Sequence, residues 1–116
     1  MPKVYIGACE YEVRITKTKK ESDKCLGKEE EINGTIWVTR GTCFLHEKRI
    51  VVRHTLKSKQ DRYEVLLHEG IHAICHEFAE SKTLCDLCAD EVAVAILSKS
   101  IASYLRQIRD NGVLDQ

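Results

Sequence analysis

The residues best suited to chemistry in this chain are His68-Glu69-Gly70-Ile71-His72, an H-E-x-x-H pattern. The apolar residues around them recur every three or four positions, which predicts an amphipathic helix. Residues four apart lie on one helix face, so the two imidazoles can bind one metal ion together. Glu69 lies near that face and can accept a proton from a metal-activated water. The pattern is typical of a zinc hydrolase, with His68 and His72 as ligands and Glu69 as the catalytic base rather than a ligand.

A catalytic zinc site takes three protein ligands and leaves a fourth position open for water. The third ligand should come from a separate element that crosses the motif helix, and Glu91 near the start of the next predicted helix is the favoured candidate. Asp90 competes with it, because Asp90 shares the apolar stripe of that helix and a buried carboxylate would need a partner. The predicted Zn²⁺ ligands are therefore His68, His72 and Glu91, with Asp90 as the alternative to Glu91.

Gly70 argues against an ordinary surface helix that carries two partly exposed histidines and an ion-pairing glutamate. A glycine inside a helix costs about 1 kcal/mol relative to alanine, which suggests that another group approaches the backbone there. His76 continues the histidine row by one turn, and we read it as an ordinary polar residue. Four residues are candidates for stabilising an oxyanion, with no order among them: Tyr63, His76, His54 and Tyr104.

The chain has six cysteines, of which Cys85 and Cys88 form a C-x-x-C pair. One such pair is a weak metal signal, although Cys25 and Cys43 would complete a four-cysteine zinc site. A redox role for the pair is a further alternative. We expect ordinary thiols, because a reducing compartment disfavours disulfides. The pair nevertheless ends three residues before the favoured third ligand, where it would compete for the catalytic metal.

The elements that must position these residues are strands first and helices second, which favours an α+β fold. Apolar residues that alternate with polar ones predict strands at 3–16, 35–39 and 49–53. Apolar residues that recur every three or four positions predict helices at 59–79 and 85–108. The charged stretch 17–33 is interpreted as a solvated loop. We expect one domain over 1–116, in which a small antiparallel or mixed sheet of about three strands packs on the motif helix. The second, C-terminal helix would support the motif helix from behind.

Composition limits the classes of function. Apolar residues make up 43% of the chain and charged residues 31%, and the 18 basic and 18 acidic residues cancel, so no bulk field indicates nucleic acid or an anionic membrane. Residues 1–60 carry 13 basic and 8 acidic side chains, a net +5, whereas 61–116 carry 5 and 10, a net −5 that suits a cation site. No apolar run is long enough to span a membrane. The N-terminus lacks a secretory signal, so we expect a cytoplasmic protein.

The stretch 63–76 resembles the motif helix of the ImmA/IrrE-like zinc metallopeptidases. That family often has a histidine four residues after the motif, as His76 is here, and a downstream helix with a glutamate ligand followed by alanines and large apolar residues, to which Glu91–Leu97 is similar. Ile71 fills a position where the family commonly has glycine. The resemblance covers roughly residues 34–105 and implies a small gluzincin-like peptidase, with the ligands and base named above.

These patterns predict a zinc-dependent metallopeptidase that hydrolyses a peptide bond through a metal-activated water and acts on a protein or peptide substrate, such as a regulatory protein. Zinc lowers the pKa of its bound water from about 16 towards about 7, and Glu69 would take the proton and pass it to the leaving amine. The alternative is a catalytically silent metal-binding module with a regulatory or interaction role.

Overall fold

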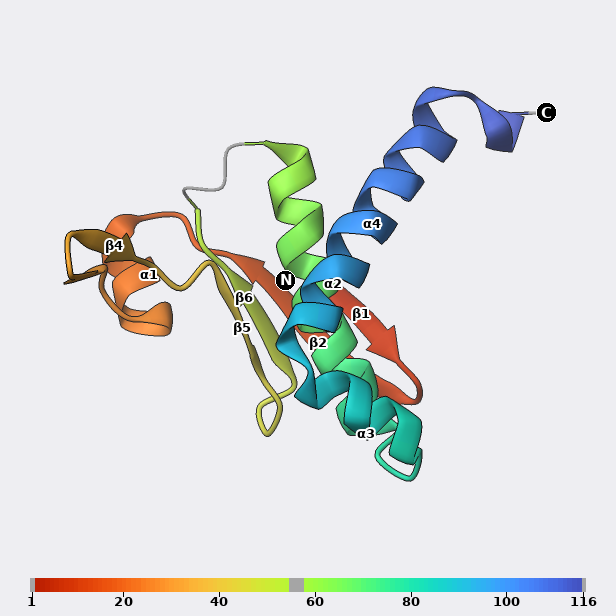
Figure 1. Ribbon diagram of the computed structural model, residues 1–116, viewed down its shortest axis with the longest axis horizontal. Coiled ribbons are helices and arrows are strands. Elements are labelled where there is room, and N and C mark those ends of the chain that lie inside the picture. Colours follow the sequence, from red (N-terminus) through yellow and green to blue (C-terminus); the bar gives the residue numbers. More distant parts are fainter. Residues whose placement is uncertain (1, 55–57, 116) are drawn as a thin grey trace.

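The computed structural model describes residues 2–54 and 58–115, and its architecture is α+β, as the sequence predicts (Figure 1). The elements in chain order are β1 Lys3–Ile6, β2 Cys9–Ile15, α1 Lys19–Leu26, β3 Glu30–Ile32, β4 Thr35–Trp37, β5 Gly41–Phe44, β6 Arg49–Val52, α2 Lys59–Glu77, α3 Lys82–Ala89, α4 Glu91–Asp110 and the short 3-10 helix η1 Val113–Asp115. Among the described helices, none is both long enough and apolar enough to cross a membrane.

The main sheet has four strands, one more than predicted, in the order β1-β2-β6-β5. The stretch predicted as one strand, 3–16, is a hairpin, because the chain reverses at Gly7, whose φ is +60°. β2 and β6 are parallel, with Val13 opposite Ile50, and the other two pairs of strands are antiparallel. The sheet is therefore mixed, and β5 forms one of its edges.

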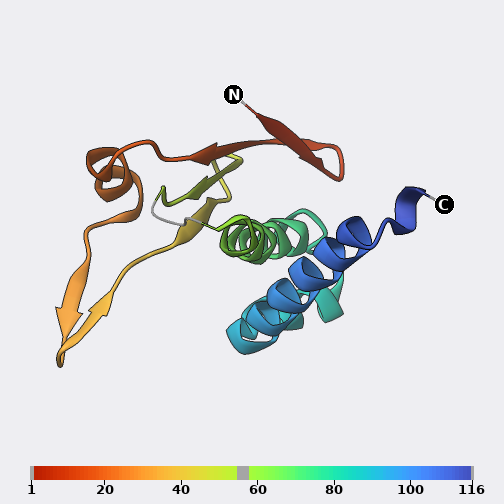
Figure 2. The same cartoon turned by 90° about the horizontal axis from the view of Figure 1, so that it is seen from above.

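The stretch 17–33 is not the loop that its charge predicts. It contains α1, in which the Thr18 side chain caps the first turn by accepting from the Glu21 N–H, and Ser22 and Leu26 are buried. The predicted strand 35–39 forms only as far as Trp37, and β4 pairs with β3 rather than with the main sheet. β3 and β4 form a separate two-stranded ribbon that projects from the body of the protein (Figure 2).

Helix α2 lies against one face of the sheet, and α4 packs on α2 from the opposite side (Figure 2). The N-cap of α2 is Ser58, whose side chain accepts from the Asp61 N–H. The core between α2 and the sheet includes the buried side chains of Tyr11, Ile50, Val52, Val65 and Ala73. This packing fixes which face of α2 is free to carry the motif.

The second predicted helix, 85–108, is two helices rather than one. α3 ends at Ala89 and α4 begins at Glu91, with Asp90 as the residue between them. The Asp90 carboxylate accepts from the Ala93 N–H at 3.0 Å, so it caps α4 in the way that Asp usually starts a helix. The break turns the chain back, so that the first turn of α4 faces α2.

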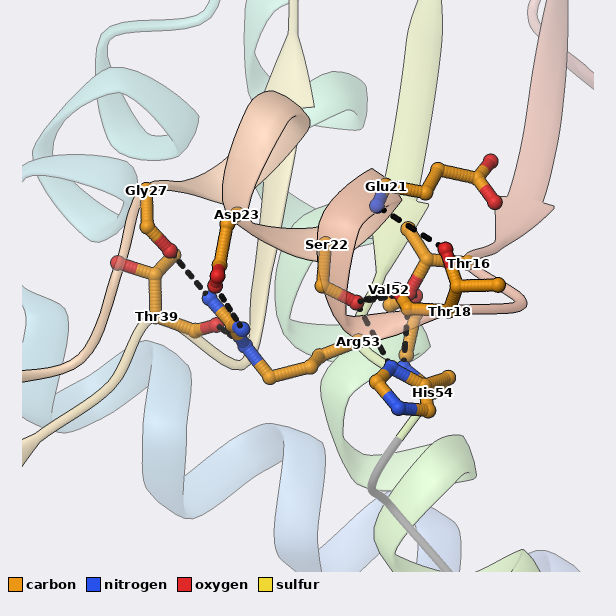
Figure 3. A network of polar contacts seen from close by, with 10 residues as sticks. All are labelled: Thr16, Thr18, Glu21, Ser22, Asp23, Gly27, Thr39, Val52, Arg53 and His54. Carbon is orange, nitrogen blue, oxygen red and sulfur yellow. Dashed lines mark hydrogen bonds and ion pairs between the residues drawn. The ribbon is translucent and has the colours of Figure 1, made fainter.

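Two polar networks join these parts. In the first, shown in Figure 3, the almost fully buried Arg53 at the end of β6 donates from Nε to the Thr39 carbonyl at 2.7 Å and from Nη2 to the Gly27 carbonyl at 2.8 Å. Its Nη1 lies 3.5 Å from a carboxylate oxygen of Asp23 on α1. Gly27 precedes β3 and Thr39 follows β4, so Arg53 holds both stems of the ribbon and ties them to α1.

The second network joins α2 to the sheet. Lys48, in the turn before β6, contacts both carboxylate oxygens of Glu77, at 2.7 and 2.8 Å, and the Tyr11 hydroxyl donates to Glu77 Oε2 at 2.9 Å. The hydrogen bond from Lys48 lowers the pKa of Glu77 and raises that of Lys48. The C-terminal end of the motif helix is therefore attached to β2 and to the β5–β6 turn.

Candidate metal centre

Three side chains from two helices meet at the middle of α2. The Nε2 atoms of His68 and His72 lie 3.3 Å apart, and the Glu91 carboxylate faces both of them, with Oε2 3.1 Å from His68 Nε2 and Oε1 2.9 Å from His72 Nε2. The spacing of four residues on α2 brings the imidazoles together, and the turn at Asp90 brings Glu91 to them. We searched the described residues, 2–54 and 58–115, for three or more histidine, cysteine, aspartate or glutamate side chains close enough to hold one metal ion. His68, His72 and Glu91 form such a group.

The donor set fits a zinc ion. Zinc takes His nitrogen and carboxylate oxygen at roughly 2.0–2.2 Å in tetrahedral geometry, which places neighbouring donors roughly 3.3–3.5 Å apart. The observed separations of 2.9 to 3.3 Å are close to that spacing. The histidine side chains are 26% and 18% exposed and that of Glu91 is 66% exposed, so one side of the group is open to solvent. The arrangement thus offers three donors and one free direction, which a catalytic metal needs.

The structure separates the two competing carboxylates. The Asp90 side chain is used as the cap of α4, and the Glu91 side chain is the one that contacts the histidines. Asp90 precedes the first helical residue and its side chain is directed to the Ala93 N–H, whereas Glu91 begins the helix that packs on α2. Glu91 is therefore the residue that the fold brings to the predicted third position.

Glu69 lies beside the histidines, half-buried against β5. Its pKa is raised to about 7, chiefly because the carboxyl group is buried; a backbone hydrogen bond from Cys43 opposes the rise, and the nearby Glu91 carboxylate adds to it. A carboxylate with a pKa near neutrality can both accept and release a proton under ordinary conditions. Glu69 does not belong to the three-donor group, and its role as a base rather than a ligand stays a prediction.

Cys88 has a position that the sequence did not indicate. Its Sγ lies 2.9 Å from His72 Nδ1, on the ring edge opposite to the one that faces Glu91. The sequence predicts that Cys88 competes for the metal, whereas in the structure it contacts the far side of the imidazole of a predicted ligand. Its partner in the C-x-x-C pair, Cys85, is exposed and contacts the Ala79 carbonyl instead. Of the described residues, no cysteine belongs to the three-donor group, so the four-cysteine site with Cys25 and Cys43 does not form here.

Gly41, not Gly70, is the glycine that close packing requires. A Cβ on Gly41 would lie 2.5 Å from Cγ1 of Val65 and 3.7 Å from Cγ of Glu69, so α2 approaches β5 at this point. A Cβ on Gly70 would meet nothing within 4 Å, so the expected close approach at Gly70 is wrong. Gly41 is the first residue of β5, and its missing side chain lets the motif helix lie against that strand.

A cleft of about 730 Å³ lies beside the three donors. It is lined by residues of α2, of α4 and of the segment from the end of β4 to the start of β5. A smaller cavity of about 340 Å³ continues past the donors along β5. His68, Glu69 and Glu91 line both of them. The lining residues of these two cavities do not include any of the predicted oxyanion candidates, Tyr63, His76, His54 and Tyr104.

His54 is occupied elsewhere. Its Nδ1 lies 2.8 Å from the Ser22 hydroxyl, and its backbone N–H donates to Thr16 Oγ1 at 2.9 Å, next to the Arg53 network (Figure 3). This histidine therefore joins α1 to the end of the main sheet rather than facing the cleft.

Comparisons of this chain with protein-family models, with curated proteins and with solved structures find no match. The resemblance to the ImmA/IrrE-like peptidases accordingly remains a prediction from the residues of the motif helix.

Proposed function

We propose that this protein is a zinc-dependent peptidase, in which His68, His72 and Glu91 hold the metal and Glu69 is the catalytic base. The observation that carries the proposal is the convergence of three donor atoms at distances of 2.9 to 3.3 Å beside a half-buried glutamate. The first two ligands and the base come from one helical turn, and the third comes from a helix packed against it. This combination is the one that metal-assisted hydrolysis needs.

A zinc ion bound there would polarise a substrate carbonyl and make a water molecule more acidic. The protein's own contribution is the transfer of protons. Glu69 accepts a proton from the attacking water and later gives it to the nitrogen of the leaving amine, so the same carboxylate serves as base and then as acid.

A peptide substrate is favoured over other acyl compounds by the edge strand. β5 pairs with β6 on one side, and Gly41, Thr42 and Cys43 line the cavities on the side of Glu69. An extended peptide can add to such an edge through main-chain hydrogen bonds. Main-chain recognition would hold a scissile peptide bond beside the donors whatever its side chains are.

Metal analysis tests the site first. We expect one zinc per chain in the wild type, and a loss of affinity for His72→Ala and Glu91→Gln that exceeds the roughly 10–100-fold effect of removing an outer-shell partner. His76→Ala and Asp90→Asn are matched controls, because His76 is an exposed histidine one turn along α2 and asparagine caps a helix as well as aspartate. Equal zinc binding by Glu91→Gln and Asp90→Asn would contradict the assigned ligands.

Activity tests the chemistry. Incubation of the zinc-loaded protein with a peptide library, read by mass spectrometry, is expected to give cleavage products in the wild type and none above background in Glu69→Gln, which should still bind zinc. Cleavage that survives Glu69→Gln undiminished would contradict the mechanism. Zinc binding with no cleavage by the wild type would favour the alternative of a metal-binding module without turnover.

A further inference from the structure

The ribbon β3–β4 supplies one wall of the cleft. Trp37 and Val38, at the end of β4, line the cleft together with His68 and Glu69. The Trp37 side chain is 60% exposed, although tryptophan is usually well buried. An exposed aromatic residue at the edge of a cleft offers contact area to an apolar side chain of a bound molecule.

The wall is held in place, not free. A two-stranded ribbon has little stability of its own, and β3 and β4 pair only with each other among the described strands. Arg53 fixes both stems through its hydrogen bonds to Gly27 and Thr39 (Figure 3). Its backbone N–H also donates to the Arg40 carbonyl at 2.8 Å, directly before β5. Arg53 is therefore a positioning residue for Trp37.

The two ends of the cleft differ in charge. The donor end carries the carboxylates of Glu69 and Glu91, and Lys99 lines the far end, eight residues further along α4 and thus about 12 Å away at 1.5 Å per residue. Arg40 also lines the cleft, and its guanidinium lies 3.8 Å from the Asp61 carboxylate. Lys99 makes no ion pair with any residue that the structure describes.

One carboxylate lies among these basic groups. Glu64 also lines the cleft, and its Oε1 accepts from Gln60 Nε2 at 3.4 Å on the same helix. Arg40 is paired with Asp61 and Glu64 accepts a hydrogen bond from Gln60, so the basic group of this end that makes no ion pair with a described residue is Lys99.

We propose that the cleft selects an extended peptide segment with an acidic side chain three or four residues from the scissile bond and an apolar side chain between them. The separation of about 12 Å corresponds to three or four residues at about 3.3 Å each. The acidic group contacts Lys99 and the apolar group packs on Trp37. The position of the scissile bond in this inference rests on the proposed function. The recognition of the acidic and apolar side chains is a binding property that can be measured without cleavage.

Binding is measured with full-length, zinc-loaded Glu69→Gln protein. The probes are fluorescein-labelled ten-residue peptides, each with one apolar residue and one glutamate, and each compared with a twin that carries glutamine. We expect the glutamate peptide to bind about five-fold more tightly, the size of a surface ion pair. Lys99→Glu should reverse the preference, and the preference should weaken as salt is added. Arg106→Glu makes the same charge change on the same helix outside the cleft and should have no effect.

Trp37 is the only tryptophan of the chain, so its emission reports on contact directly. The emission should change when the peptide binds. A twin peptide with serine in place of the apolar residue should bind the Glu69→Gln protein more weakly than the original peptide does. The two peptides should bind equally well to a protein that carries both Glu69→Gln and Trp37→Ala. Binding without any change in emission would overturn the placement against Trp37.

The outcomes separate the two proposals. Equal affinity for the glutamate and glutamine twins, or an unchanged preference in Lys99→Glu, overturns the inference even if the wild type cleaves peptides. Selective binding with no cleavage by the wild type overturns the proposed function and leaves the acidic-peptide site standing. If the wild type cleaves, mass spectrometry should place the cut three or four residues from the glutamate, and cuts at unrelated distances would contradict the geometry.

Discussion

Removal of the Arg53 guanidinium is expected to release the ribbon before it unfolds the domain. Arg53→Met keeps most of the aliphatic volume but deletes the hydrogen bonds to Gly27 and Thr39 and the ion pair to Asp23. Arg53→Lys keeps the charge, but one ammonium group cannot reach acceptors on three separate segments in the way that a planar guanidinium does. Comparison of the two variants therefore separates the effect of the positive charge of Arg53 from the effect of its hydrogen-bond geometry.

The magnitude follows from the contacts. Each hydrogen bond from a charged donor contributes about 1.5–3 kcal/mol, and removing one partner of a buried ion pair costs about 3–5 kcal/mol. Arg53 is only 3% exposed, so solvent cannot replace its contacts. We expect Arg53→Met to lose about 3–5 kcal/mol and Arg53→Lys about half of that, against a typical total stability of about 5–15 kcal/mol.

Urea unfolding followed by two signals measures this. Circular dichroism reports on the helices, and Trp37 emission reports on the ribbon. In Arg53→Met the Trp37 transition should come at lower urea than the helical transition, whereas the two should coincide in the wild type. Arg49→Met on the same strand is the control, since Arg49 contacts the face of Phe44 and should lose about 0.5–1 kcal/mol. A loss below about 1 kcal/mol in Arg53→Met, with coincident transitions, would refute the role of Arg53 as a clamp.

Three further predictions concern the packing, the site and the response to pH. Gly41→Ala forces a methyl group to within 2.5 Å of α2 and should lose about 1–3 kcal/mol in urea unfolding, whereas Gly70→Ala meets nothing and should gain about 1 kcal/mol; equal effects would contradict the close approach. Cys88→Ala removes the partner of a predicted ligand and should weaken zinc binding roughly ten-fold by competition with a chelator, and Cys85→Ala should leave it unchanged. The hydrogen bond from Lys48 lowers the pKa of Glu77 in the folded state, so the contribution of Glu77 to stability is present above the unfolded pKa of about 4.3 and is lost as the pH falls through the folded value. In urea unfolding at a series of acidic pH values, Glu77→Gln should reduce the loss of stability at low pH. The same loss in the variant and the wild type would exclude this contribution.

The parts of the site that depend on local spacing were predictable. His68 and His72 are four residues apart on a helix, and that geometry holds wherever the helix lies. The choice between Glu91 and Asp90 depended on where a helix begins, and a shift of one residue there changes which side chain faces α2. The Asp90 side chain caps α4, and the Glu91 side chain is the one that contacts His68 and His72. Cys88 was close in sequence, but its contact with His72 depends on a break between α3 and α4 that the sequence pattern did not reveal.

The fold was predictable in class and less so in detail. Leu97 and Ile101 are large apolar residues of α4, yet they are both 37% exposed, whereas the small residues Ser98 and Ala102 are buried. α4 has one main neighbour, α2, and small residues at that contact let the two helices approach closely. The charge of 17–33 concealed α1, because its buried face consists of little more than Ser22 and Leu26. The contacts of Arg53 join segments that are far apart in the sequence, and no local pattern contains them.

The ribbon has a consequence for how this protein can diverge. It is inserted between β2 and β5, and its tip at Asn33 and Gly34, both with positive φ, is a tight hairpin turn remote from the donors. Changes in its length or in its outward side chains would leave the main sheet, α2 and the first turn of α4 untouched. If the proposed function holds, the apolar contact at Trp37 lies on a stretch of chain separate from His68, Glu69, His72 and Glu91, so exchange of this one hairpin would change that contact and leave the proposed site as it is.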